Sequence, residues 1–282
     1  MLRRFTVHRV STVDQAIALR TRFAEDAAIY AGGTELLLAM KAGFARWRNL
    51  IDVKLIGDLR GITLTDGVVR VGATATHWDI ERDPTVARVL PALARLEANV
   101  ANVRVRAAGT LAGNIAFAEP HADPPPLLMA LGARVVLQGR SGTRRVPVDA
   151  FVVGMYETSL GADEVITAVE IPVPPATMRA AYVKFQILER PSVGVAIAAE
   201  VDGDRFTSAP AVVVGAVDEM PRRVPTDALA GARMRDAADA LADAARGAVD
   251  PVGDLAGSPE FKRHLVGVFT RRALDALAAQ AA

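Results

Sequence analysis

The sequence of 282 residues contains no cysteine. A disulfide framework is therefore excluded, and so are an iron–sulfur cluster held by thiolates and a structural zinc site built from cysteines. Any redox chemistry of this chain must use an organic cofactor, or a metal bound through nitrogen and oxygen atoms alone. The histidines do not favour a metal. None of His8, His77, His121 and His264 lies four positions from another, and we expect no metal site.

Long apolar runs and an excess of one charge sign are also missing. The longest obvious apolar run, Ala209 to Val217, has the length of a buried strand and is too short to span a membrane. The 33 basic and 32 acidic residues leave a net charge of +1, which argues against nucleic acid or an anionic membrane as a partner. The first residues show no apolar segment of a secretory signal, so we expect a cytoplasmic protein without a transmembrane segment.

The first half of the chain mixes helices and strands around turns rich in glycine. Thr12 and Gln15 have the spacing of a capping box and predict the start of a helix. Ala28 to Ala31 reads as a short strand, which runs through a Gly-Gly turn into a helix over residues 35–42. Asp66-Gly67, between two alternating segments, is a strong β-hairpin signal.

Further along, apolar residues at helical spacing predict a helix within Pro84 to Val100. Asp123, followed by three prolines, predicts an aspartate N-cap of a helix that ends at Gly132. After a proline-rich linker at 172–175, three strands are expected at 181–188, 193–201 and 211–217, followed by two helices. Strands followed by helices indicate an α+β domain at the C-terminus.

Two short segments carry the residues expected at a nucleotide cofactor. Ala31-Gly32-Gly33-Thr34-Glu35-Leu36 and Gly109-Thr110-Leu111-Ala112-Gly113-Asn114 combine glycines, which let the backbone approach a ligand closely, with hydroxyl and amide groups. The first segment alone is more typical of an ordinary turn before a helix, and the second alone is not specific to a ligand site. Neither matches the Walker loop or the Gly-x-Gly-x-x-Gly fingerprint of dinucleotide-binding folds.

Together the two segments resemble those of one family, the FAD-binding medium subunits of the molybdenum hydroxylases, which include xanthine, aldehyde, nicotinate and carbon monoxide dehydrogenases. That family pairs an Ala-Gly-Gly-x-x-Leu loop with a later Thr-Ile-Gly-Gly-Asn loop and a Pro-x-x-Asp-x-x-Pro stretch. The last is matched here by Pro120 to Pro126, and the resemblance covers essentially the whole chain.

The resemblance implies an α+β fold. A two-part FAD-binding domain of the vanillyl-alcohol oxidase/PCMH type, with subdomains at 1–57 and 58–174, would precede a smaller α+β domain of antiparallel strands and helices at 175–282. It also implies FAD as the cofactor. Residues 31–36 and 110–114 would hold the pyrophosphate, and Asp123 would accept hydrogen bonds from sugar-alcohol hydroxyls. The expected cofactor-binding residues are Ala31, Gly32, Gly33, Thr34, Glu35, Leu36, Ala101, Thr110, Leu111, Ala112, Gly113, Asn114, Asp123, Ile166 and Lys184.

Some positions depart from the family or allow a second interpretation. Ala112 stands where glycine is usual, and an aromatic residue that shields the flavin in some members is missing near Ser192. Lys184 matches a family lysine that faces the flavin, although a lysine in water at a strand edge is the alternative. His77 and His121 are expected in loop or core positions rather than at the ligand.

The resemblance implies a subunit that transfers electrons and needs partners. A large subunit with the molybdenum cofactor would oxidise the substrate, and a small subunit with [2Fe-2S] clusters would pass electrons to FAD. The acceptor stays open among NAD, quinone, a cytochrome and O2. Two alternatives remain: a self-contained flavoenzyme of the same fold, which would need an acid or base beside the flavin, and a non-catalytic assembly subunit without FAD.

Overall fold

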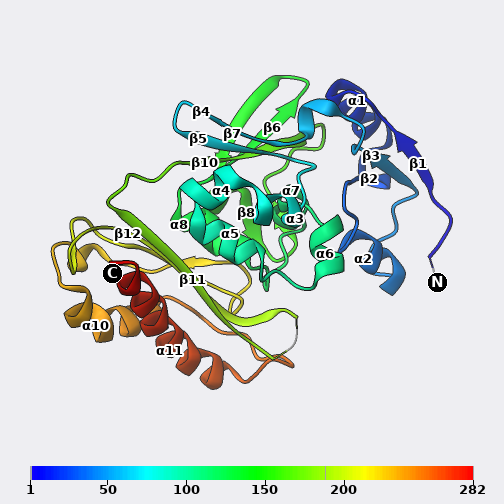
Figure 1. Cartoon of the computed structure of the whole chain (residues 1–282). Helices are drawn as coiled ribbons and strands as arrows, with labels where there is room; N and C mark the ends of the chain where they lie inside the picture. Colours follow the sequence, from blue (N-terminus) through cyan, green and yellow to red (C-terminus); the bar gives the residue numbers. More distant parts are fainter. Residues whose placement is uncertain (1, 188, 282) are drawn as a thin grey trace.

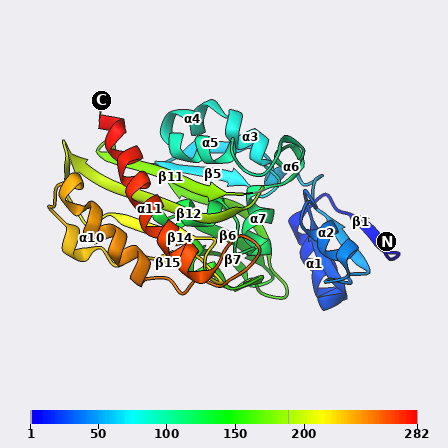
Figure 2. The same ribbon diagram turned by 90° about the horizontal axis from the view of Figure 1, so that it is seen from below.

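The computed structural model describes residues 2–187 and 189–281, and it places three parts of the chain in a row (Figures 1 and 2). The N-terminal part, in blue, lies at one end. The C-terminal part, in yellow to red, lies at the other end, and the cyan and green segments lie between them. No helix among the described residues is long and apolar enough to cross a membrane.

The N-terminal part is a small parallel sheet with two helices. The strands are β1 (Thr6–Arg9), β2 (Ala27–Tyr30) and β3 (Asn49–Asp52), in the order β1-β3-β2. Helix α1 (Val13–Phe23) begins where the sequence predicts, because the Thr12 hydroxyl accepts a hydrogen bond from the backbone N–H of Gln15. Helix α2 (Leu36–Ala42) follows the Gly-Gly turn directly.

The middle part is built on a five-stranded antiparallel sheet in the order β4-β5-β10-β6-β7. Its strands are β4 (Ile62–Thr65), β5 (Val68–Gly72), β6 (Arg134–Gly139), β7 (Gly142–Pro147) and β10 (Val165–Pro172). The hairpin predicted at Asp66-Gly67 is confirmed. Both residues have a positive φ, 50° and 74°, as the tight turn between twisted strands requires.

Helices cover this sheet on the side that faces the C-terminal part. They are α3 (His77–Arg82), α4 (Pro84–Val89), α5 (Pro91–Glu97), α6 (Val103–Ala108), α7 (Leu111–Phe117), α8 (Pro124–Ala130) and α9 (Val148–Phe151), with a two-stranded hairpin of β8 (Val152–Gly154) and β9 (Glu157–Thr158). The segment from Pro84 to Val100 is helical, as its apolar spacing predicts, but it forms two helices. Pro91 forces Leu90 out of the helical region, to φ −134° and ψ 54°, and divides the segment into α4 and α5.

The C-terminal part is an antiparallel sheet with two long helices. Strands β11 (Met178–Gln186), β12 (Pro191–Asp202), β14 (Ala211–Gly215) and β15 (Arg222–Arg223) lie in this order, and the short β13 (Arg205–Phe206) pairs with β12. Helices α10 (Met234–Gly247) and α11 (Pro259–Ala278) close the chain. The predicted α+β architecture is confirmed. The first predicted strand extended to Leu188, which lies outside the described residues.

Strand β12 shows how this sheet joins the two halves of the molecule. Its side chains alternate between two separate hydrophobic cores. Val195 and Ile197 pack under α10 and α11, whereas Ala196 and Ala198 pack into the core of the middle part. Because both faces are covered, β12 is apolar at nearly every position instead of alternating with polar residues. Figure 1 shows α10 and α11 on one side of this sheet and α5 and α8 on the other.

Candidate cofactor-binding site

A cavity of about 810 Å³ lies where the three parts meet. Its wall is formed by the β2–α2 turn, the α6–α7 turn, the loop before α8, strand β10 and the start of β12. The structure brings the predicted site residues together here, all except Leu111 and Lys184. The cavity has the size of a pocket for a small organic ligand.

The two glycine-containing turns touch each other through their backbones. A Cβ atom on Gly32 would lie 2.1 Å from the carbonyl oxygen of Ala108 and 2.7 Å from Cα of Gly109, so no larger residue fits between them. Gly33 has a φ of +70°, in the left-handed region that glycine adopts without strain. These glycines therefore allow the two turns to form one continuous wall.

The second glycine-containing segment, residues 109–114, is mostly the start of a helix and not a loop. Thr110 caps helix α7, because its hydroxyl accepts a hydrogen bond of 3.0 Å from the backbone N–H of Gly113. Residues 111–114 are the first turn of that helix. The side chain of Leu111 is completely buried in the core of the middle part and does not line the cavity, so only its backbone is available for the predicted ligand contact, which stays a prediction.

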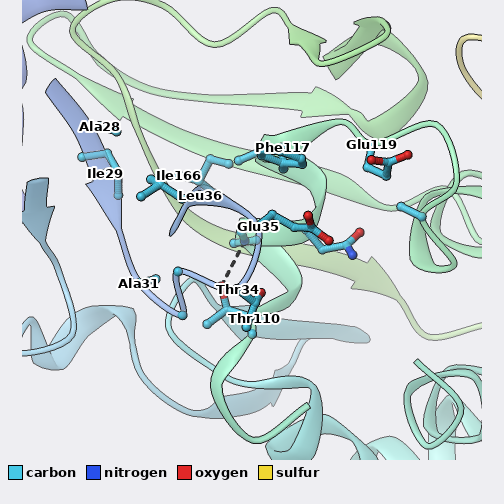
Figure 3. Close-up of a pocket in the computed structure, with 18 of the residues that line it drawn as sticks. Ala28, Ile29, Ala31, Thr34, Glu35, Leu36, Thr110, Phe117, Glu119 and Ile166 are labelled. Atoms are coloured by element: carbon cyan, nitrogen blue, oxygen red, sulfur yellow. Dashed lines mark hydrogen bonds between the residues drawn. The ribbon is translucent and has the colours of Figure 1, made fainter. Parts of the chain in front are cut away.

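The cavity wall has an apolar region and a polar region (Figure 3). Ala28, Ile29, Leu36, Phe117 and Ile166 lie together on one side, whereas Thr34 and Thr110 lie close to each other at the two turns. An apolar region suits an aromatic ring system, and hydroxyl groups beside backbone N–H groups suit phosphate oxygens.

The polar groups of the wall include unsatisfied ones that a ligand could satisfy. Within the described part of the chain, the backbone N–H groups of residues 32–36 donate no hydrogen bond, and the buried side-chain oxygen of Asn114 accepts none. Buried polar atoms are normally paired. The cavity size, the close glycine contacts and these free donors and acceptors therefore fit a bound dinucleotide.

Asp123 occupies the predicted N-cap position of helix α8, but its side chain makes no capping hydrogen bond. The first three residues of α8 are prolines, which have no N–H to donate, so the carboxylate points elsewhere. It accepts hydrogen bonds from the Tyr182 hydroxyl at 2.8 Å and from the Lys184 ammonium at 3.0 Å. Burial raises the pKa of the Asp123 carboxyl, and the two partners oppose this rise.

Lys184 lies behind Asp123 and not on the cavity wall. Its ammonium donates to Asp123 and, at 2.8 Å, to the backbone oxygen of Asn99, and its side chain is only 12% exposed. The structure thus contradicts the alternative of a lysine in open water. It also places a carboxylate between Lys184 and the cavity, so the lysine compensates the charge of Asp123 directly.

We expect Lys184→Met to lower the free energy of unfolding by about 3 kcal/mol, because it leaves the buried Asp123 carboxylate without its charged partner. Urea unfolding of the FAD-free protein measures this loss. Arg145→Met is the control: Arg145 pairs with Glu170 on an exposed surface, its side chain is 53% exposed, and its loss should cost less than about 1 kcal/mol. Equal losses in the two variants would contradict the role assigned to the buried pair.

Glu119 and Arg190 form a charged cluster at the cavity that the sequence did not reveal as a unit. Glu119 accepts from the Tyr156 hydroxyl at 2.7 Å, from Arg190 at 2.6 Å and from the His121 ring at 2.9 Å. Arg190 also contacts both carboxylate oxygens of Glu35, at 2.9 and 3.0 Å. Arg190 lies in no recognisable motif, so no local signal in the sequence could have placed it here.

The cluster strongly shifts two ionisable groups. Burial alone would raise the pKa of Glu119, but hydrogen bonds from His121 and Tyr156 and the charge of Arg190 lower it to about 2. Burial and the neighbouring Glu119 raise the pKa of Tyr156 to about 12. Near neutral pH, Glu119 is therefore a carboxylate and Tyr156 a neutral phenol.

The low pKa of Glu119 predicts an acid-sensitive contribution to stability. A carboxyl with a depressed pKa in the folded state stabilises that state above its unfolded value of about 4.5, and the contribution is lost as the pH falls towards about 2. We expect Glu119→Gln to be less stable than the wild type at pH 7, by up to about 3 kcal/mol. Unfolding measured from pH 7 to pH 2 should show this difference shrinking below pH 4.5. A difference independent of pH would contradict the prediction.

The described residues contain no group of three or more His, Asp or Glu side chains that could hold a metal ion. His121 contacts Glu119 and, through its other ring nitrogen, Asp254 at 3.1 Å. Both ring nitrogens therefore serve in hydrogen bonds, and the one to Asp254 links the middle part to the segment before α11.

Comparisons with known proteins agree with this geometry. Residues 3–174 match the family model described as the FAD binding domain in molybdopterin dehydrogenase, and residues 188–277 match the CO dehydrogenase flavoprotein C-terminal domain. The chain is 33% identical to the carbon monoxide dehydrogenase medium chain of Hydrogenophaga pseudoflava, over 99% of both chains. It is 27% identical to a putative xanthine dehydrogenase FAD-binding subunit of Escherichia coli, over 97% of this chain and 96% of that protein.

A solved structure agrees as well. The chain superimposes on a chain of the carbon monoxide dehydrogenase from Hydrogenophaga pseudoflava with a TM-score of 0.96 and 34% identity, covering 100% of both chains. Because the two structures match over their full length, the match includes both glycine turns and strand β10, which line the cavity.

Proposed function

Because this chain belongs to the FAD-binding medium subunits of the molybdenum hydroxylases, we propose that it carries electrons from iron–sulfur clusters of a small partner subunit to an external acceptor. A large partner subunit with the molybdenum cofactor would oxidise the substrate. The observation that carries the proposal is the cavity lined by the two glycine turns. Its size and its free hydrogen-bonding groups suit FAD.

Bound FAD would supply a carrier that accepts electrons singly and releases them in pairs. The chain's own residues would bind and orient it. The backbone N–H groups of residues 32–36 suit the pyrophosphate oxygens, and the free side-chain oxygen of Asn114 suits a hydroxyl donor. Asp123 lines the cavity and, with two protein donors, keeps capacity to accept from a further hydroxyl. The apolar side around Phe117 and Ile166 suits the flavin ring.

The need for partners follows from composition and from the relatives. With no cysteine, the chain has no thiolate ligands for the clusters that would reduce its flavin. The relative in Hydrogenophaga pseudoflava is called a medium chain, a name that implies larger and smaller companions. We therefore assign the molybdenum cofactor and the [2Fe-2S] clusters to separate chains.

The pKa values of Glu119 and its neighbour Tyr156, and the contacts of His121, argue against a self-contained flavoenzyme. Such an enzyme needs a general acid or base whose pKa lies near the working pH. Glu119, with a pKa of about 2, and Tyr156, with a pKa of about 12, are far from that range. His121 is engaged by carboxylates at both ring nitrogens.

Rapid mixing tests the proposed direction of electron flow. The FAD-loaded chain is mixed anaerobically with the chemically reduced iron–sulfur subunit, and the visible absorbance of the flavin is followed. We expect the absorbance to bleach only when the reduced partner is present. A flavin that stays oxidised beside a reduced, bound partner would exclude this subunit from the electron path.

A further inference from the structure

A buried histidine–glutamate pair lies beside the cavity and has no part in the function proposed above. His77 is the first residue of α3 and Glu97 the last residue of α5. Nδ1 of His77 is 2.5 Å from Oε2 of Glu97, and the two residues are 2% and 0% exposed. The other carboxylate oxygen of Glu97 has no hydrogen-bond partner among the described residues. Among the described residues, His77 is therefore the side chain that engages the Glu97 carboxyl.

The pair lies under the junction of the two glycine turns. The backbone N–H of His77 donates to the carbonyl oxygen of Gly109 at 3.0 Å, and Thr76 pairs with Thr110. A Cβ atom on Gly109 would lie 3.2 Å from both Cδ2 of His77 and the hydroxyl oxygen of Thr34. Since Nδ1 is held by Glu97, the opposite ring edge, with Cδ2 and Nε2, faces this junction, and His77 is part of the cavity wall.

The surroundings of the pair leave one ring nitrogen for a ligand. Two neighbouring carboxylates are engaged elsewhere: Asp123 is paired with Lys184, and Glu81 on α3 is paired with Arg106 on α6. Nδ1 of His77 is engaged by Glu97, so Nε2 is the nitrogen that can reach a ligand. A phosphate oxygen only accepts hydrogen bonds, so a contact between the two requires Nε2 as an N–H donor.

The cavity needs such a donor. Five carboxylates line it, those of Glu25, Glu35, Glu119, Asp123 and Glu189, whereas FAD carries a negatively charged pyrophosphate. Arg190, one of the two arginines of the wall, is engaged by two carboxylates. The other, Arg20, donates to the backbone oxygen of Gly161 at 3.2 Å.

We propose that His77, held by Glu97, donates a hydrogen bond from Nε2 to a phosphate oxygen of FAD at the junction of the two turns. This assignment rests on the proposed FAD site. His77 is a binding and positioning residue in this role, and Glu97 sets the orientation of its ring and the nitrogen that faces the ligand.

Two substitutions separate a phosphate contact from simple packing. The amide of His77→Asn can replace Nδ1 and keep the contact with Glu97, but it loses the donor at Nε2. The amide of His77→Gln can replace Nε2 and loses the contact with Glu97. We expect His77→Asn to bind FAD at least about tenfold more weakly while the FAD-free protein keeps its melting temperature. His77→Gln should show the reverse, a lower melting temperature and an FAD affinity within about threefold of the wild type.

Nitrogen NMR of the full-length wild type gives an independent result, which also holds if a variant fails to fold. The sequence has four histidines, so the resonances of His77 can be identified by their loss in either variant. We expect Nε2 to carry a proton and to shift when FAD or ADP is added, because both contain the diphosphate. An Nε2 without a proton, or one that responds to neither ligand, would overturn the proposal. So would wild-type FAD affinity in His77→Asn. A wild-type chain that takes up no FAD at all would instead contradict the cofactor site itself.

Discussion

Gly32→Ala should weaken FAD binding by roughly a hundredfold, equivalent to about 2.7 kcal/mol. The added methyl carbon would lie 2.1 Å from the carbonyl oxygen of Ala108, a backbone atom that no side-chain rotation can move away. The two turns would have to separate, and the wall that they form together would open. The rest of the fold gains its stability from cores that do not include this contact, so the FAD-free protein should lose far less than the complex.

Gly57→Ala is the matched control for this prediction. A Cβ atom at Gly57 has nothing within 4 Å, and the residue does not have a positive φ. It should bind FAD as the wild type does. FAD titration followed by flavin fluorescence, together with thermal unfolding of the FAD-free forms, measures both effects. Wild-type affinity in Gly32→Ala would show that the contact between the two turns does not form the cofactor site.

The isolated chain should oxidise no substrate, even when fully loaded with FAD and supplied with an artificial electron acceptor. Turnover should appear only after the large and small partner subunits are added. The rate of substrate oxidation should rise from an unmeasurable value for the isolated chain to the rate of the complete complex. The physical reasons are the absence of thiolate ligands for clusters and the pKa values of Glu119, about 2, and of its neighbour Tyr156, about 12, which are far from neutral.

The assay uses a panel of purines, aldehydes, N-heterocycles and carbon monoxide, first with the isolated chain and then with its co-purifying chains. The isolated chain should still pass electrons from a chemical reductant to an artificial acceptor, which serves as the control that its flavin is active. Substrate-dependent bleaching of the flavin in the isolated chain would favour the self-contained flavoenzyme.

Local chemistry made much of the fold predictable from the sequence. The Asp66-Gly67 turn depends on backbone conformations that few other residue pairs adopt, and the hairpin is found there. Thr12 caps the first helix through a contact three residues away. The division of the helical segment at Pro91 is also local in origin, because a proline keeps the preceding residue out of the helical region.

The candidate site likewise has features that the sequence predicts and features that it does not. The glycine turns were recognisable because close approach of a backbone to a ligand requires glycine, and their order along the chain matched a family. The burial of the Leu111 side chain could not be predicted, because the sequence does not show which side of a helix turn faces the core. Asp123 looked like a cap because its neighbours in the sequence favour one, although the prolines that follow leave the cap without donors.

The sequence by itself determined that redox chemistry in this chain cannot use thiolate ligands, that α+β parts follow one another, and where the two glycine turns lie. These properties depend on composition and on contacts between near neighbours in the chain. Only the tertiary structure decided the electrostatics of the cavity. Lys184 meets Asp123 from 61 positions away, Arg190 meets Glu35 from 155 positions away, and His77 meets Glu97 across two helices. Pairs this distant form because the packing of separate sheets and helices brings them together, and no spacing in the sequence records that packing.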